Sequence, residues 1–164
     1  MEIVPLHVVM GKIISRLHQV GHYLIDHGHY DMGREVFETL SLGDDSYENG
    51  DFAYGLGRAC EGKGELKAAL DWYRIAYENN PPVPQFEASV QRVTDKLREA
   101  GISVDDGYRL GDFSFGRGQG HEGMGNLRMA FVWYRSAHEF NPAVPEFAEA
   151  HKRLAKAIGE PEPG

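Results

Sequence analysis

Apolar residues recur along the middle of the chain at the spacing of an amphipathic helix. Between residues 66 and 77 they fall at every third or fourth place, which puts them on one face of a helix. Pro81 predicts the end of this helix, because a residue that precedes proline avoids the helical conformation. A shorter apolar pattern over residues 52–60 predicts a helix upstream. Gly62 and Gly64 then predict a tight reversal, so residues 50–81 are expected to form a helix hairpin.

The same pattern returns 61 residues later. Residues 50–98 align with residues 111–159 without a gap, and 21 of the 49 aligned positions are identical. Unrelated sequences would share roughly three, so the chain contains an internal repeat. Each copy continues past its hairpin into a further apolar stripe, which predicts a third helix over about 85–100 and again over 145–158.

Each copy resembles the tetratricopeptide repeat (TPR) family. The signature of this family places Gly in the first helix and at the turn, Ala and an aromatic residue in the second helix, and Pro after it. The first copy supplies Leu56, Gly57, Gly64, Ala69, Tyr73, Ala76 and Pro81. The second copy supplies Gly118, Gly125, Ala130, Tyr134, Ala137 and Pro142, and it departs from the signature at Arg117.

A weaker match lies upstream, at Val20, Gly21, Gly28, Phe37 and Leu40, with Gly33 in place of Ala and Asp45 in place of Pro. The Trp-Tyr pairs and the abundant glycine are also similar to Sel1-like repeats, which share the architecture. The resemblance implies an all-α fold: a right-handed TPR-like superhelix of helix hairpins with added third helices.

The expected organisation is a single TPR-like helical domain over 1–159. Its repeats are expected at about 14–47, 50–83 and 111–144, the extra helices at about 84–100 and 145–158, and a flexible tail at 160–164. An apolar stripe over residues 3–27 predicts a long first helix, of which only the second half belongs to the first repeat. The excess over residues 3–13 either caps the superhelix or contacts a second subunit, which would give a homodimer through the N-terminal helix.

Composition narrows the class of protein. Hydrophobic residues at 41% and charged residues at 26% are ordinary for a globular domain. A net charge of −8 argues against nucleic acid and against a membrane surface as partners. The single cysteine, Cys60, has no partner for an internal disulfide, and no apolar run is long enough to span a bilayer, so a cytoplasmic protein is expected.

The residues that could carry chemistry do not form a catalytic pattern. His18, His22 and Asp26 are spaced to line one side of a helix and contain the ligand types that zinc prefers, but no fourth ligand is apparent. Polar lining of a binding surface is the expected role, and no cofactor or metal is predicted. Cys60 is expected to be a core thiol, and the chain is expected not to be an enzyme.

The TPR resemblance implies that the first helices of the hairpins line a concave groove, which binds a protein or peptide partner. The expected groove residues are His18, His22, Ile25, Asp26, Tyr54, Arg58, Glu61, Phe115, Gln119 and Glu122. Tyr54 and Phe115 are expected to face solvent and to supply apolar anchors. The sequence therefore predicts a non-enzymatic interaction module, an adaptor or scaffold.

Two alternatives remain at this point. The glycine-rich run over residues 28–33, with residues 36–40 and 55–60, is similar to type III secretion translocator chaperones, which keep a secreted partner soluble in the cytoplasm. The long interval between the second and third repeats departs from their contiguous array. An enzyme or metal-binding protein with no recognisable site is the other alternative.

Overall fold

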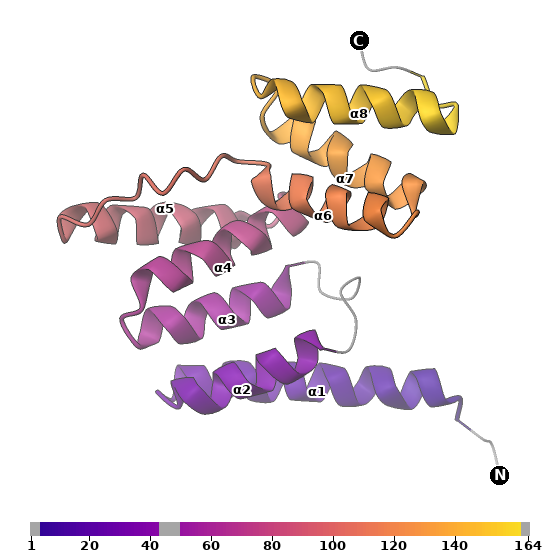
Figure 1. Ribbon diagram of the computed structural model, residues 1–164. Coiled ribbons are helices and arrows are strands. Elements are labelled where there is room, and N and C mark those ends of the chain that lie inside the picture. The colour runs from indigo at the N-terminus through magenta and orange to yellow at the C-terminus, as the bar shows by residue number, and fades with distance from the viewer. Residues whose placement is uncertain (1–3, 43–49, 162–164) are drawn as a thin grey trace. The chain divides into compact units, whose positions relative to one another are not determined.

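The computed structural model describes residues 4–42 and 50–161, and in these ranges the chain forms eight α-helices and no strand (Figure 1). The prediction of an all-α, TPR-like fold is confirmed. Asp45 and the end of the predicted tail lie outside the described residues. None of the described helices is both long and apolar enough to cross a membrane.

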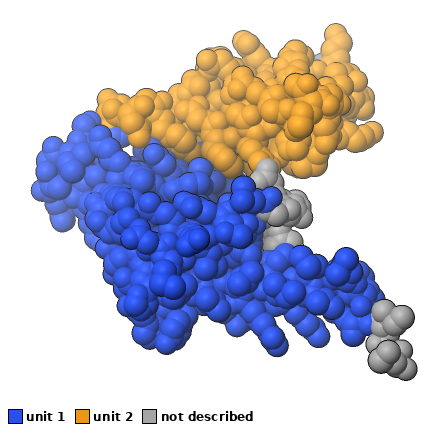
Figure 2. Space-filling view, turned by 60° about the horizontal axis from the view of Figure 1, so that its bottom comes forward, with its two compact units in different colours: residues 1–104 blue, residues 105–164 orange. Residues whose placement is uncertain are grey.

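The chain divides into two compact units, residues 1–104 and residues 105–164, coloured separately in Figure 2. Unit 1 contains α1 (Leu6–Asp26), α2 (Tyr30–Ser41), α3 (Asp51–Gly62), α4 (Leu66–Asn79) and α5 (Pro84–Glu99). Unit 2 contains α6 (Asp112–Gly123), α7 (Leu127–Phe140) and α8 (Pro145–Ile158). This division into two units does not test the prediction of a single domain over residues 1–159, which stays a prediction.

Within each unit every helix packs against the next one along the chain, and in unit 1 α1 also contacts α3. The close approach of each hairpin depends on a glycine in its first helix. A Cβ at Gly57 would lie 2.6 Å from the ring of Tyr73, and a Cβ at Gly118 would lie 2.5 Å from the ring of Tyr134. Both tyrosine rings are therefore packed directly on helix backbone.

The added third helices begin at a proline in their first turn, Pro84 in α5 and Pro145 in α8, where the missing N–H costs no hydrogen bond. Each helix buries an aromatic ring against its own hairpin: Phe86 and Phe147 are fully buried. α5 adds Val93 and Leu97 to the core that contains Tyr73, while α8 adds Leu154 to the core that contains Tyr134.

Gly50 caps α3 in a left-handed conformation with φ +84°, and Gly111 caps α6 with φ +99°. Both positions are buried against the end of the second helix in the hairpin. A Cβ at Gly50 would lie 2.5 Å from the carbonyl oxygen of Ala76, and one at Gly111 would lie 2.8 Å from that of Ala137. Glycine is thus required at these caps for its conformation and for its size.

Candidate partner-binding face

Arg58 joins the first two hairpins of unit 1. Its guanidinium donates to Nδ1 of His22 at 2.8 Å and to a carboxylate oxygen of Asp26 at 2.5 Å. α1 and α3 therefore bring together three of the residues predicted for the groove. His18 lies beside them, with its ring centroid 4.7 Å from that of His22. We call His18, His22, Asp26 and Arg58 the α1–α3 polar cluster.

The charges of this cluster follow from its surroundings. Burial, and then the neighbouring His18 and Arg58, lower the pKa of His22 to about 4, against the opposing effect of Asp26. The hydrogen bond from Arg58 holds the pKa of Asp26 below its usual value. At neutral pH His22 is therefore a neutral acceptor of the hydrogen bond from Arg58, and Arg58 forms an ion pair with Asp26.

The zinc alternative considered for His18, His22 and Asp26 is not supported by this geometry, because the guanidinium of Arg58 lies against both His22 and Asp26. Within residues 4–42 and 50–161, no group of three or more His, Cys, Asp or Glu side chains is placed to hold a metal ion.

Cys60 lies within the core of unit 1, as predicted, and only 3% of its surface is exposed. Burial raises the pKa of its thiol, although Arg34 donates to the sulfur at 3.3 Å and acts in the opposite direction. A thiol in this environment is a poor nucleophile.

The prediction that Ile25 lines the groove is wrong. It is 5% exposed and packs with Phe37, Phe52 and Leu56 in the core of unit 1. Ile25 and His22 are three positions apart and so lie about 60° from each other around α1, and Ile25 is on the side that packs into the core with Phe37 of α2.

Glu61 is held by internal hydrogen bonds from three side chains rather than left free for a partner. Its carboxylate accepts from the hydroxyl of Tyr73 at 2.7 Å, from Arg92 at 2.8 Å and from Lys96 at 2.7 Å. Burial acts to raise the pKa of Glu61, but the hydrogen bonds from Arg92, Lys96 and Tyr73 lower it to about 2. This carboxylate ties the hairpin of α3 and α4 to the added helix α5.

Unit 2 contains the same arrangement. The carboxylate of Glu122 accepts from the hydroxyl of Tyr134 at 2.7 Å and from Arg153 at 3.0 Å. The hydrogen bonds from Arg153 and then Tyr134 lower the pKa of Glu122 to about 2. We call the sets Glu61–Tyr73–Arg92 and Glu122–Tyr134–Arg153 the two Glu–Tyr–Arg clamps.

Arg92 and Arg153 are the residues of this arrangement that the sequence analysis did not single out. Each follows its clamp glutamate by 31 positions, and both copies keep the pair. That shared spacing was visible in the internal alignment. It could have indicated that Glu61 and Glu122 have an internal partner on the third helix.

The prediction that Tyr54 and Phe115 face solvent as apolar anchors is wrong. The ring of Tyr54 lies 5.1 Å from that of Phe86 on α5 and 5.6 Å from that of Tyr73. The ring of Phe115 lies 5.0 Å from that of Phe147 on α8 and 5.2 Å from that of Tyr134. Both rings are half-buried, because the third helix of each copy covers them.

Tyr54→Ala is therefore expected to lower the free energy of unfolding of unit 1 by about 2–3 kcal/mol, since it removes a ring that packs on two aromatic neighbours. Urea unfolding followed by circular dichroism would measure the change. Phe115→Ala is the matched variant of unit 2 and should give a loss of similar size. An unchanged unfolding midpoint in both variants would contradict the packing described above.

The tetratricopeptide repeat family model matches residues 21–84. Over this range the chain is similar to the tetratricopeptide repeat family. The matched residues run from Gly21, near the end of α1, to Pro84, the first residue of α5, so they include all of α2, α3 and α4 and three members of the α1–α3 polar cluster. The predicted resemblance is confirmed over this range.

Comparisons with solved structures give weaker similarities. A crystal structure of a T3SS complex from Aeromonas hydrophila is 20% identical, with a TM-score of 0.48, over 90% of this chain and 79% of that chain. A crystal structure of PcrH in complex with the chaperone binding region of PopB is 20% identical, with a TM-score of 0.42, over 90% of this chain and 93% of that chain. No curated protein matches the chain significantly.

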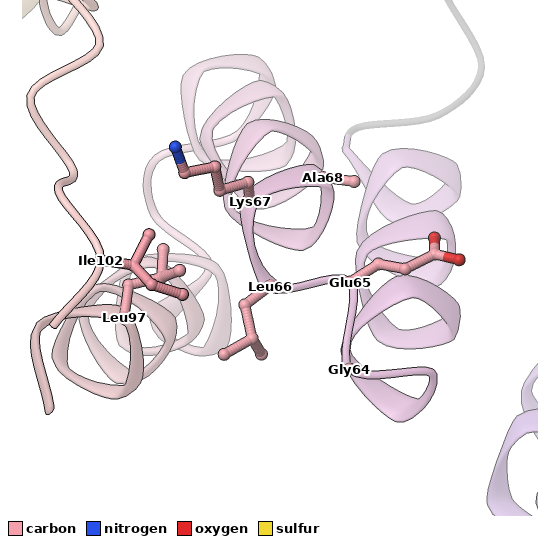
Figure 3. Close-up of a pocket in the computed structure, with 7 residues that line it drawn as sticks. All are labelled: Gly64, Glu65, Leu66, Lys67, Ala68, Leu97 and Ile102. Atoms are coloured by element: carbon pink, nitrogen blue, oxygen red, sulfur yellow. The ribbon is translucent and has the colours of Figure 1, made fainter. Parts of the chain in front are cut away.

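The residues matched by the family model also border a hollow that the sequence analysis did not predict. Its volume is about 330 Å³, and it lies at the turn between α3 and α4 beside the end of α5 (Figure 3). The lining residues are Gly64, Glu65, Leu66, Lys67, Ala68, Leu97 and Ile102. None of them belongs to the polar cluster.

Phe115, Gln119 and Glu122 belong to unit 2, whereas the other predicted groove residues belong to unit 1. Gln119 is exposed on α6, and Glu122 is taken up by its clamp. That the residues of both units line one groove stays a prediction.

Proposed function

We propose that this chain is a non-enzymatic protein-interaction module, and that a segment of a partner protein binds on the α1–α3 polar cluster of unit 1. The observation that carries the proposal is the tetratricopeptide repeat match over residues 21–84. Repeats of this type stack helix hairpins so that their surfaces bind extended partners. The matched hairpins bring His22, Asp26 and Arg58 into contact, which gives a partner both donors and acceptors.

The cluster is suited to recognition because its members are already held in place. Arg58 is fixed by Asp26 and His22, and its side chain remains 27% exposed, while that of Asp26 is 55% exposed. Side chains that are ordered before binding lose less conformational entropy when a partner arrives. On α5, Arg92 and Lys96 are ordered by Glu61 and are 46% and 47% exposed, so they extend the polar surface.

Arg58→Gln tests this site with a substitution that the chain itself suggests, because Gln119 occupies the equivalent position of the second copy. The variant is expected to fold and to bind the partner at least tenfold more weakly, since arginine anchors commonly contribute that much. Calorimetry with the partner recovered by co-purification from the native host and identified by mass spectrometry would measure the affinity.

Arg98→Gln is the matched control. Arg98 is 61% exposed on α5 and pairs only with Asp95 on its own helix among the ion pairs described for it. It should bind as the unchanged chain does. Full binding by a folded Arg58→Gln variant would move the partner away from the polar cluster.

The second candidate is a chaperone of a secreted protein, which rests on the similarity of residues 28–40 and 55–60 to translocator chaperones. The same co-purification separates the candidates: a secreted protein recovered in stoichiometric amount favours the chaperone, and a retained metal or small cofactor favours the enzyme alternative.

A further inference from the structure

A row of apolar side chains on α1 is left largely exposed by the fold. Leu6, Met10, Ile13, Leu17, Val20 and Leu24 alternate at spacings of four and three residues. This is the heptad spacing with which two helices pack along each other. We call these six residues the α1 seam. At 1.5 Å per residue it extends over about 27 Å.

The α1 seam is open to solvent. Its first five members are between 39% and 76% exposed, although each is a large apolar side chain. The residues that α1 buries are Gly21 and Ile25, which lie beside the seam on the side of the helix that packs against α2. The first turns of α1 reach past the end of α2 (Figure 1), so α2 does not cover the seam there. Exposed apolar surface of this extent marks an interaction site.

The C-terminal end of the seam opens into a hollow between α1 and α2. Leu17 and Leu24 line it together with Met32, Val36, Glu35 and Thr39, and its volume is about 310 Å³. Met32 is 56% exposed. An apolar side chain from a helix lying on the seam would therefore enter a preformed pocket at this end.

The charges beside the seam distinguish between possible occupants. From Leu6 to Ile25 the helix carries Lys12 and Arg16 and no carboxylate, although the whole chain has a net charge of −8. Arg16 stands directly beside the seam at the flanking heptad position, and Lys12 lies further round the helix. The one carboxylate of α1, Asp26, lies at the C-terminal end of the helix and is already paired with Arg58. If a second copy of α1 paired with the first, the cations of both helices would therefore have no free carboxylate of α1 to balance them.

We propose that the α1 seam binds an amphipathic helix of a partner protein, with its own apolar heptad seam and with acidic residues at the flanking positions. Helix-in-groove recognition of this kind uses anchors at three- and four-residue spacing, which is the spacing of the seam. This surface is separate from the polar cluster, so the chain has two binding faces in unit 1.

The test uses the full chain and three synthetic peptides of three heptads. One has Leu at the seam positions and Glu at the flanking positions, the second has Lys in place of Glu, and the third has the residues of the first in an order without the heptad spacing. Fluorescence anisotropy should show that the Glu peptide binds at least tenfold more tightly than either of the others. Its affinity should fall as salt is raised, because exposed charge pairs are screened.

Two chain variants locate the binding. Met10→Gln combined with Ile13→Gln should lower the affinity for the Glu peptide at least tenfold and leave the helical circular dichroism unchanged. Val8→Gln is the matched control, since Val8 is exposed on α1 but lies off the seam. It should bind as the unchanged chain does.

Several results would overturn the proposal. Equal binding of the Glu and Lys peptides would remove the acidic partner. A dimer in analytical ultracentrifugation that the double variant dissociates, with no binding of the Glu peptide, would assign the seam to a second copy. Binding to vesicles of phosphatidylserine and phosphatidylcholine, again without binding of the Glu peptide, would assign it to a membrane surface.

Discussion

Gly50→Ala is expected to lower the free energy of unfolding by about 3–4 kcal/mol. Two costs add at this position. Gly50 has φ +84°, where a side chain is strained, and the new Cβ would lie 2.5 Å from the carbonyl oxygen of Ala76 and 2.7 Å from the ring of Phe86. The carbonyl belongs to the backbone of α4 and cannot move aside without shifting that helix.

Substitutions at two other glycines measure the conformational strain and the steric clash separately. Gly64 has φ +78° and open space around a Cβ, so Gly64→Ala should cost only the conformational strain, about 1 kcal/mol. Gly57 has an ordinary helical conformation, but its Cβ would meet the ring of Tyr73, so Gly57→Ala should cost about 1–3 kcal/mol from overpacking alone. Urea unfolding of the three variants gives the comparison. A loss at Gly50 no larger than that at Gly64 would show that α4 does not approach the cap of α3.

Glu61→Ala is expected to lower the free energy of unfolding by about 2–3 kcal/mol, because it leaves the buried hydroxyl of Tyr73 without its acceptor and releases Arg92 and Lys96. Glu87→Ala on α5, which is exposed, is the control and should change the stability little. A double-mutant cycle with Arg92→Ala would isolate the coupling across the clamp.

The clamp also predicts how stability responds to acid. The pKa of Glu61 is lowered to about 2 in the folded chain, so the unfolded chain takes up the proton first as the pH falls. The stability that the clamp supplies is complete above the ordinary pKa of a glutamate and is lost between there and about pH 2. Glu61→Ala should therefore flatten the acid limb of a stability profile measured by urea unfolding. An acid limb of unchanged steepness would contradict the depressed pKa.

The helices of this fold could be predicted from local pattern. Apolar spacing placed α3, α4 and each third helix, glycine placed the turn between α3 and α4, and Pro81 placed the end of α4. These signals are local because a helix period, a positive φ and a missing N–H are properties of a few adjacent residues. The internal alignment then extended each assignment to the second copy.

The candidate site was harder to predict, because it depends on what covers each helix. Tyr54 falls on the side of α3 that a hairpin alone would leave open, but Phe86 of α5 lies over it. In the sequence Glu61 looks like an ordinary surface carboxylate. Its role as an internal acceptor depends on Arg92, 31 positions away. Side chains brought together by packing between helices leave no periodic signal in either helix.

Each copy of the internal repeat contains one glycine cap, one glycine beneath a tyrosine ring and one clamp. The caps are at Gly50 and Gly111, and the tyrosines are Tyr73 and Tyr134. Each copy thus contains its own means of holding three helices in register, and the identical residues of the two copies include these internal contacts. The copies differ where side chains reach outward: Arg58 corresponds to Gln119, and Lys96 to Ala157. The two copies thus keep the residues that pack their three helices together and differ in residues that are exposed. A ligand that binds the exposed side chains of one copy would meet different functional groups on the other.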